Sequence, residues 1–321
     1  MSLTLFVSDR PISLFPMRRQ SGMWKISAVK DAAKAALPFQ HSLRRLKRTI
    51  RPYTDNPTNS SLALHQGLQQ IDALRKAGCG ISGDILELGS GWLPIIPILF
   101  QIAGARKLIL TDIERLMDAH TVELAKKVIA ANTTKVAQGL GISELGVRSR
   151  LGEPFLPDYR VDWAPSQTRS DSVDAIISRT VLEHVRPNYL EMLFTEFARM
   201  LRPDGAMCHI IDNSDHWEHR DKTISRVNFL RYEERDLLWK VACFNPQTYQ
   251  NRMRHSDYAK FFRRLGWKEV LAAGEPDRKV LQDLEGLQLA RAFRDRDRQD
   301  LAILTSLFVL RRESSSGPQL R

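Results

Sequence analysis

The stretch from Asp84 to Trp92 constrains the fold of this 321-residue chain more than any other. It reads Asp-Ile-Leu-Glu-Leu-Gly-Ser-Gly-Trp, so a short apolar run is followed at once by Gly89 and Gly91. The apolar run predicts a buried parallel strand, and glycine lets a ligand approach the backbone closely. Pro94 stands where the first turn of a helix would begin. Strand, glycine turn and helix together predict a nucleotide-type site at the carboxyl end of an open α/β sheet.

The spacing to the next acid supports this prediction. Residues 107–111 predict the next strand, which leads into Asp112. An acid at that tip, about 20 residues after the glycines, is placed to accept hydrogen bonds from ribose hydroxyls. The third glycine of a dinucleotide-binding motif is missing, which argues against NAD. Glu87, before the glycines, instead suits a ligand that carries a positively charged amino-acid group beside an adenosine.

Four segments in this order resemble class I S-adenosylmethionine-dependent methyltransferases: residues 85–91, Asp112, residues 172–178 and residues 201–205. The resemblance spans about Gly83 to Ile211, with a weaker tail to Leu310. It implies a Rossmann-like α/β fold, in which helices flank a seven-stranded sheet of six parallel strands and a last antiparallel one. It also implies S-adenosylmethionine as the cofactor.

The resemblance implies a set of cofactor-binding residues: Glu87, Gly89, Ser90, Gly91, Asp112, Asp162 and Arg179. The two glycines would pass under the cofactor, with Glu87 near its amino end and Asp112 at its ribose. Asp162, near the end of the predicted third strand, would face the adenine amino group; a surface-loop acid is the alternative. Arg179 ends the predicted fourth strand, which would face the transferred methyl group.

The turn after the fourth strand distinguishes classes of acceptor. It reads Ser-Arg-Thr-Val at residues 178–181, where DNA enzymes that methylate amino groups have a Pro-Pro-aromatic loop, so the chain resembles the small-molecule branch. Residues 212–255 predict an insertion that binds a polar, ring-shaped acceptor. Parts of it resemble bacterial methyltransferases of cell-surface glycan assembly. A hydroxyl on a glycan, a quinone or a lipid-linked molecule is therefore the expected acceptor.

Three histidines are candidates for removing the hydroxyl proton. His216 and His219 lie in the insertion, and His184 follows the fourth strand. Histidine has an ordinary pKa near 6.5, so it can accept a proton close to neutrality. The run from Asp215 to Asp221 also invites a metal interpretation, but magnesium prefers carboxylate and water ligands. A histidine base is favoured, no metal ligand is predicted, and a hydrogen-bonded polar loop is the remaining alternative.

Charge is distributed unevenly along the chain. Residues 1–60 hold eleven Lys or Arg against three Asp or Glu, so most of the net charge of +11 lies there. Trp24 to Arg48 is amphipathic and basic, which fits either a solvated helix or peripheral contact with an anionic membrane. No aromatic-interleaved basic groove is visible, so nucleic acid is not the expected partner. A tRNA or rRNA methyltransferase and a non-catalytic binding module remain as alternatives.

The predicted organisation has five parts: a basic extension at 1–59, a cofactor-binding core at 60–211, the insertion at 212–255, the rest of the core at 256–312 and a disordered tail at 313–321. Single helices are predicted at Glu114–Leu140 and Leu284–Phe293. Three scattered cysteines form no disulfide framework, and no apolar stretch reaches the length of a membrane span. A cytoplasmic protein is expected, with an extension that is either solvated or in contact with the inner face of the membrane.

Overall fold

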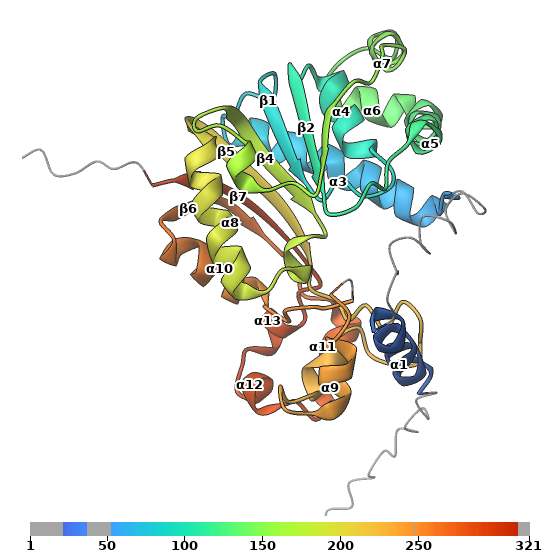
Figure 1. Ribbon diagram of the computed structural model, residues 1–321, viewed down its shortest axis with the longest axis vertical. Helices are drawn as coiled ribbons and strands as arrows, with labels where there is room; N and C mark the ends of the chain where they lie inside the picture. Colours follow the sequence, from blue (N-terminus) through green and yellow to red (C-terminus); the bar gives the residue numbers. More distant parts are fainter. Residues whose placement is uncertain (1–21, 37–52, 247, 314–321) are drawn as a thin grey trace, which may run out of the picture.

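The computed structural model describes residues 22–36, 53–246 and 248–313, and its centre is one seven-stranded sheet (Figure 1). The strand order is β3-β2-β1-β4-β5-β7-β6. The strands are β1 Asp84–Leu88, β2 Lys107–Asp112, β3 Asp158–Val161, β4 Val173–Arg179, β5 Leu201–Asp212, β6 Trp267–Ala273 and β7 Thr305–Arg312. Strand β7 runs antiparallel to both of its neighbours, and the other six share one direction. The predicted Rossmann-like sheet is confirmed.

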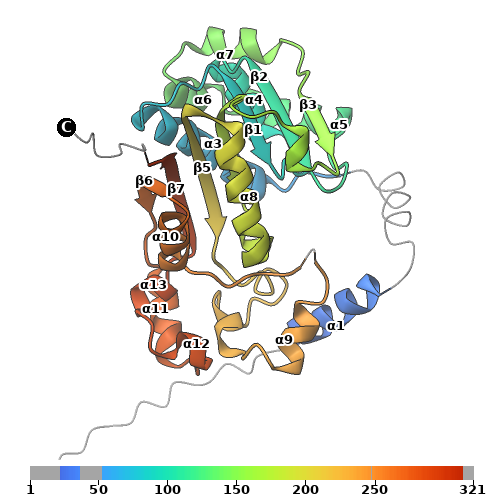
Figure 2. The same ribbon diagram turned by 60° about the vertical axis from the view of Figure 1, so that its left-hand side comes forward.

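Helices cover both faces of this sheet, so the middle residues of its central strands are mostly apolar and buried. One face packs against α3 Pro57–Lys76, α4 Ile95–Ala103, α5 Ala119–Ala131, α6 Thr133–Leu140 and α7 Glu144–Leu151. The other packs against α8 Pro187–Met200 and α10 His255–Arg264 (Figure 2). Ile85 of β1 faces the first layer and Leu86 faces the second, and both are fully buried.

Register brings the carboxyl ends of three strands to one edge. Leu88, the last residue of β1, pairs with Thr111 of β2 and with Ser178 of β4. The residues that follow these three positions are Gly89, Asp112 and Arg179. The predicted cofactor-binding segments therefore meet at one end of the sheet, although they are far apart in the sequence.

The prediction of a single helix at Glu114–Leu140 is wrong. The chain forms a loop after β2, then α5 and α6 as separate helices. Asp118 begins α5, since its side chain accepts a hydrogen bond from the amide of Thr121, and aspartate favours this capping position over a helix interior. Asn132 separates the two helices and donates its side-chain amide to the carbonyl of Val128. Apolar periodicity continues across both helices, so it does not reveal the break.

The helix predicted at Leu284–Phe293 is also wrong. The structure has α11 Arg278–Glu285, capped by Asp277, followed by the short helices α12 Arg291–Arg294 and α13 Arg298–Leu301. Gly286 ends α11 inside the predicted span. Gly and the capping Asp are strong local signals, and here they decide the boundaries against the apolar spacing.

A third hydrophobic cluster lies beyond the carboxyl ends of the strands, and it joins segments from three parts of the chain (Figure 1). It combines α1 Met23–Ala35, the predicted insertion with α9 Leu237–Ala242, and residues 280–304. Trp24 is 2% exposed, and its ring lies 6.2 Å from that of Trp217 and 5.5 Å from that of Tyr232. The insertion therefore shares its core with the N-terminal helix and with the segment before β7.

The basic extension is described only in part. Helix α1 covers the first half of the amphipathic segment predicted from Trp24 to Arg48. Residues 1–21, 37–52 and 314–321, the last being most of the predicted disordered tail, lie outside the described residues. Within the described ranges, no helix combines the length and the apolar character needed to cross a bilayer.

Candidate active site

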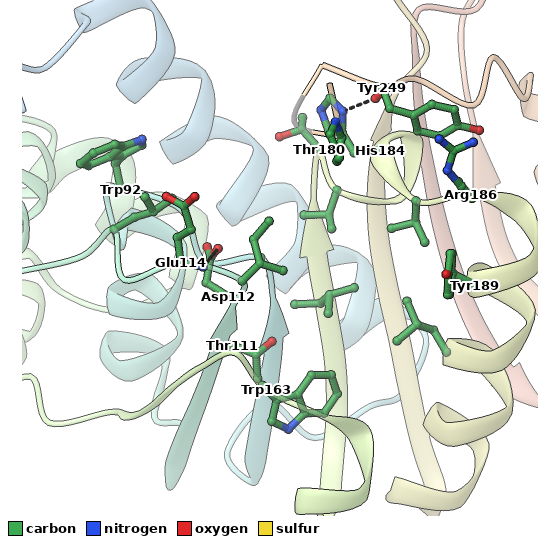
Figure 3. Close-up of a pocket in the computed structure, with 18 of the residues that line it drawn as sticks. Trp92, Thr111, Asp112, Glu114, Trp163, Thr180, His184, Arg186, Tyr189 and Tyr249 are labelled. Atoms are coloured by element: carbon green, nitrogen blue, oxygen red, sulfur yellow. Dashed lines mark hydrogen bonds between the residues drawn. The ribbon is translucent and has the colours of Figure 1, made fainter. Parts of the chain in front are cut away.

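A cavity of about 1260 Å³ opens at the carboxyl ends of β1, β2 and β4 (Figure 3). The glycine loop and the tip of β2 form one wall, and the turn after β4, helix α8 and the insertion form the opposite wall. Labelled residues of the two walls include Trp92, Asp112, Glu114, Thr180, His184 and Tyr189. The volume exceeds the roughly 300–1,000 Å³ of ordinary ligand pockets, so it has room for a nucleotide-like molecule together with a second one.

The glycine loop fits a close ligand approach. Gly89 and Gly91 have φ angles of 72° and 65°, which side chains rarely adopt. A Cβ on Gly89 would lie 2.5 Å from Cγ2 of Val181, so the first glycine lets the loop pack against the turn after β4. A Cβ on Gly91 would meet no described atom within 4 Å. The second glycine therefore leaves its backbone open beside the cavity.

Asp112 lies where a ribose-binding acid is expected. It lines the cavity, and its Oδ2 accepts a hydrogen bond of 2.9 Å from the amide of Gly91. Its Oδ1 accepts a second bond, of 3.2 Å, from the amide of Glu114. A carboxylate offers about four acceptor sites, so these two bonds orient Asp112 and leave capacity for ligand hydroxyls.

Glu87 is buried under the glycine loop and suits a positively charged ligand group. Its Oε2 has no hydrogen-bond partner among the described residues. Burial raises the pKa of Glu87 to about 7, and the negative charge of Asp112 adds to this increase. The hydroxyl of Ser90, a residue that is 9% exposed, and the charge of Arg179 act in the opposite direction. Glu87, Ser90 and Gly91 are not among the described residues that line the cavity. An ammonium group that reached Glu87 would supply the missing partner, so the charge of this residue fits the cofactor that the resemblance implies.

Asp162 and Arg179 lie beside the cavity and are not among the described residues that line it. Asp162 is exposed, with a φ of 56°, and its amide donates to the carbonyl of Asp112. Its neighbour Trp163 lines the cavity instead. Arg179 is largely buried, and its Nε donates a 2.5 Å hydrogen bond to Oε1 of Gln66. Asp162 thus bonds to the backbone of Asp112, and Arg179 bonds to the side chain of Gln66. A direct contact of either residue with the cofactor stays a prediction.

The three predicted histidines come together. His184 lines the cavity, and its Nδ1 donates to the carbonyl of Tyr249 at 2.7 Å (Figure 3), so its Nε2 carries the free lone pair. The ring of His216 lies 4.9 Å from that of His184, and the ring of His219 stacks on His216 at 5.2 Å. Burial and the charge of His216 lower the pKa of His184 to about 4. His184 is thus a neutral imidazole at the cavity wall.

Carboxylates surround this histidine cluster. Oδ2 of Asp212 lies 3.3 Å from Nε2 of His216. Burial works against ionisation of Asp212, but His216 and Ser214 lower its pKa to about 2. Glu183 is 3% exposed, and burial together with the charge of Asp212 raises its pKa well above the ordinary value. The wall next to His184 therefore holds an ionised carboxylate, Asp212, close to a buried carboxyl group, Glu183, that favours its neutral form.

Several cavity residues were not among the sequence candidates. Trp92 stacks on Tyr53 with ring centroids 5.2 Å apart, and both line the cavity. Thr180 has a left-handed φ of 52° at the turn after β4, and such strain clusters at functional sites. The guanidinium of Arg186 lies 4.5 Å from the ring centroid of Tyr249. The position of Trp92 directly after the second glycine could have indicated a cavity residue from the sequence. The backbone angle of Thr180 could not, because it is visible only in the structure.

Comparisons with known proteins agree with this geometry. A profile of the methyltransferase-domain family matches residues 62–272, which is more than half of the chain. No curated protein sequence matches significantly. Solved structures that resemble the chain include an S-adenosylmethionine-dependent methyltransferase from Mesorhizobium loti, at 14% identity and a TM-score of 0.43, covering 75% of this chain and 96% of the other.

Two further solved structures have similar statistics. The magnesium protoporphyrin IX methyltransferase from Synechocystis PCC 6803 is 13% identical with a TM-score of 0.46, and the match covers 88% of this chain and 100% of the other. A methyltransferase from Leishmania major is 12% identical with a TM-score of 0.42, with coverages of 90% and 83%. By its family match, and with a site that fits the cofactor, this chain belongs to the class I methyltransferases, enzymes that use S-adenosylmethionine.

Proposed function

We propose that the enzyme methylates a hydroxyl oxygen of a small molecule that has an apolar or aromatic body. The observation that supports this proposal is the lining of the cavity on the side of α8 and the turn after β4, away from Asp112. This lining consists mainly of apolar and aromatic side chains, among them Val185, Tyr189, Met192 and Leu193. Ligand pockets with such linings bury apolar ligand surface. Among the expected acceptors, this wall favours a quinol or another lipid-linked hydroxyl over a bare glycan, which would leave it without complementary contacts.

Arg186 is the charged group on this wall. Its guanidinium lies against the ring of Tyr249, which fixes its position while leaving its N–H donors available. An acceptor with an acidic substituent, such as a phosphate on a lipid-linked molecule, would pair with it. Arg186 therefore supports an acceptor with an apolar body and a nearby anionic group.

Catalysis requires little beyond positioning and proton removal. When bound, S-adenosylmethionine supplies a methyl group that is already electrophilic. Glu87 and Asp112 would hold its amino and ribose groups, with the glycine loop beneath it, and this orientation supplies much of the rate enhancement. The acceptor hydroxyl would face His184, with His216 and His219 behind that residue. In our proposal this histidine wall activates the hydroxyl as the oxygen–methyl bond forms.

The test compares acceptor classes. Production of S-adenosylhomocysteine would be measured with a short-chain prenylated hydroquinone, a free disaccharide and total tRNA. We expect turnover with the hydroquinone only. Turnover with tRNA, falling steeply with salt as phosphate contacts do, would contradict the proposal, and turnover restricted to the disaccharide would replace the apolar acceptor by a glycan.

A pair of variants ties the result to the cavity wall. Met192 lines the cavity, whereas Leu145 on α7 is 77% exposed and lies outside its lining. Met192→Lys should raise the KM for the hydroquinone by roughly tenfold or more, because it removes apolar contact area. Its Kd for S-adenosylmethionine should stay the same. Leu145→Lys should change neither quantity.

We also propose that α1 makes peripheral contact with an anionic membrane surface. Its inner face, with Trp24 and Ala28, is buried in the third cluster. On its outer face Met23, Ile26 and Val29 are each more than half exposed, and the exposed lysines of this helix are Lys25, Lys30 and Lys34. Apolar residues with flanking lysines suit an interface between lipid headgroups and water. Such a contact would place the cavity near a lipid-linked acceptor.

Vesicle sedimentation tests this contact. Because α1 covers part of the protein core, deleting it would expose Trp217 and confuse the result, so the full chain with Ile26→Asp and Val29→Asp is the better probe. The wild type should sediment with vesicles that contain phosphatidylserine and less with pure phosphatidylcholine. Equal sedimentation of wild type and double variant would exclude this role for α1.

A further inference from the structure

Glu183, His184 and His216 each direct one ligand-type atom toward a common space. Glu183 and His184 lie in the short helix η2 Leu182–His184 after β4, and His216 lies four residues beyond the end of β5. Their carboxylate oxygen and two imidazole nitrogens lie within 4.8 Å of one another. In a tetrahedral site with bonds of about 2.1 Å, two ligand atoms lie about 3.4 Å apart. A shift of less than about one ångström in each side chain would therefore bring the three atoms to one ion.

The carboxyl group of Glu183 has acceptor atoms available for an ion. Both carboxylate oxygens of Glu183 are buried and have no hydrogen-bond partner among the described residues. A buried carboxyl group without a hydrogen-bond partner is costly. A cation between the three side chains would supply the partner that these oxygens lack.

The surroundings of His184 match those of a metal-bound imidazole. His184 donates Nδ1–H to the carbonyl of Tyr249, which leaves the lone pair on Nε2 available. Histidines that bind metals typically have their other ring nitrogen oriented by a carbonyl or a carboxylate in this way. Nε2 of His216 makes no hydrogen bond to a described residue and lies 3.3 Å from Oδ2 of Asp212. His184 and His216 are both partly exposed, so an ion has a path to the site.

We propose that Glu183, His184 and His216 bind a divalent transition-metal ion of the zinc class. Two imidazoles and one carboxylate are a ligand set that zinc accepts, with a position left open for a further ligand, whereas magnesium favours oxygen ligands. His184 lines the cavity, so the open position lies at the acceptor end. The sequence analysis favoured a histidine base without a metal, because it considered metal ligands only in the run from Asp215 to Asp221. The site proposed here takes two of its three ligands, Glu183 and His184, from the turn after β4.

The ion's role in catalysis rests on the proposed function. An acceptor hydroxyl bound to the ion would become more acidic and release its proton to solvent. The oxygen–methyl bond then forms as the methyl–sulfur bond breaks, which yields the methyl ether and S-adenosylhomocysteine. Binding of the ion itself requires neither the cofactor nor the acceptor.

The binding experiment uses the full chain, stripped with a chelator and titrated with Co²⁺ as a spectroscopic substitute for Zn²⁺. The wild type should bind about one equivalent with a visible absorption band. Glu183→Gln and His184→Gln should lose this band. Asp212→Asn, which removes the negative charge 3.3 Å from Nε2 of His216, should weaken binding by about 10–100-fold. His65→Gln, at an exposed histidine on α3, is the matched control and should bind as the wild type does.

Calorimetric titration with S-adenosylmethionine shows that each variant is folded. No Co²⁺ binding by the wild type, or equal binding by the wild type and Glu183→Gln, would overturn the metal site and leave the proposed function standing. If Co²⁺ binds and methyl transfer is equal with and without chelator, the role in acceptor activation is overturned. If the ion binds but no hydroxyl acceptor is ever methylated, the proposed function fails and the ion site stands.

Discussion

Oδ2 of Asp112 accepts a 2.9 Å hydrogen bond from the amide of Gly91, and this bond joins the tip of β2 to the glycine loop after β1. The two residues are 21 positions apart in the sequence. One side chain thus holds the loop beneath the expected cofactor while presenting its remaining acceptor sites to the cavity. Substitutions at Asp112 should therefore affect cofactor binding in two ways, through the lost ribose contact and through a looser loop.

Replacing Asp112 by Ala should weaken S-adenosylmethionine binding by roughly 10- to 100-fold, since hydrogen bonds to charged groups contribute about 1.5–3 kcal/mol. Asp112→Asn keeps one acceptor oxygen and should have a smaller effect. Calorimetric titration measures both. Asp72→Ala, at an exposed residue of α3 paired with Lys76, is the control. Unchanged affinity in Asp112→Ala would remove this residue from the cofactor site.

Glu87→Gln should stabilise the ligand-free protein and weaken cofactor binding. The pKa of Glu87 in the folded protein is raised to about 7, so its favourable contribution to stability is present below its ordinary pKa and is lost as the pH rises through about 7. Above that pH the wild type carries a cost of about 3 kcal/mol, which glutamine avoids. Denaturant unfolding at about pH 5 and pH 8 tests this. A variant no more stable than the wild type at the higher pH would contradict the assignment.

The pH dependence of binding follows from the same group. In the wild type, S-adenosylmethionine affinity should increase between about pH 6 and pH 7.5, as Glu87 becomes a carboxylate. In Glu87→Gln the affinity should be weaker and nearly flat over that range. Parallel curves for the two proteins would show that another group controls the dependence.

Alanine substitutions at three glycines distinguish the effect of backbone strain from the effect of a steric contact. Gly78, Gly89 and Gly91 all have positive φ, and a Cβ would meet no described atom within 4 Å at Gly78 or Gly91. Gly78→Ala and Gly91→Ala should each cost about 1–2 kcal/mol of stability from strain alone. Gly89→Ala should cost more, because its Cβ would overlap with Val181. Cofactor binding should be lost in Gly91→Ala and kept in Gly78→Ala, which calorimetry would show; equal binding would mean that Gly91 does not contact the ligand.

Trp24→Ala should release α1 from the third hydrophobic cluster. The indole is 2% exposed between Trp217 and Tyr232, and its backbone amide lies 3.3 Å from Oδ2 of Asp221. Loss of a buried aromatic side chain typically costs about 3–5 kcal/mol, so hydrogen exchange in α1 and α9 should become much faster. Ile26→Ala, at a 58% exposed position of the same helix, should leave exchange near wild type. Equal protection in the two variants would show that α1 packs elsewhere in solution.

Local patterns predicted the sheet well. The apolar runs that become β1, β2 and β4 are short, bounded by glycine or charge, and largely buried, so they leave few alternatives. Helix boundaries were harder, because the apolar spacing runs through Asn132 and across Gly286 while capping groups decide where a helix ends. Aromatic residues such as Tyr53 and Tyr249 gave no signal, since their place on the cavity wall depends on segments distant in sequence.

The sequence by itself determined the sheet, the glycine loop, Glu87 and Asp112, because strand, turn and acid follow one another within 30 residues and obey local rules of burial and backbone angle. Tertiary structure alone decided which histidine reaches the cavity, that Glu183 lies buried beside His184 and His216, and that Trp24 completes the core of the insertion. These contacts join segments that are far apart in the sequence, and Glu183 and His184 meet His216 because the parallel strands β4 and β5 bring their carboxyl ends to one edge. The order of residues along the chain does not specify distances across that edge.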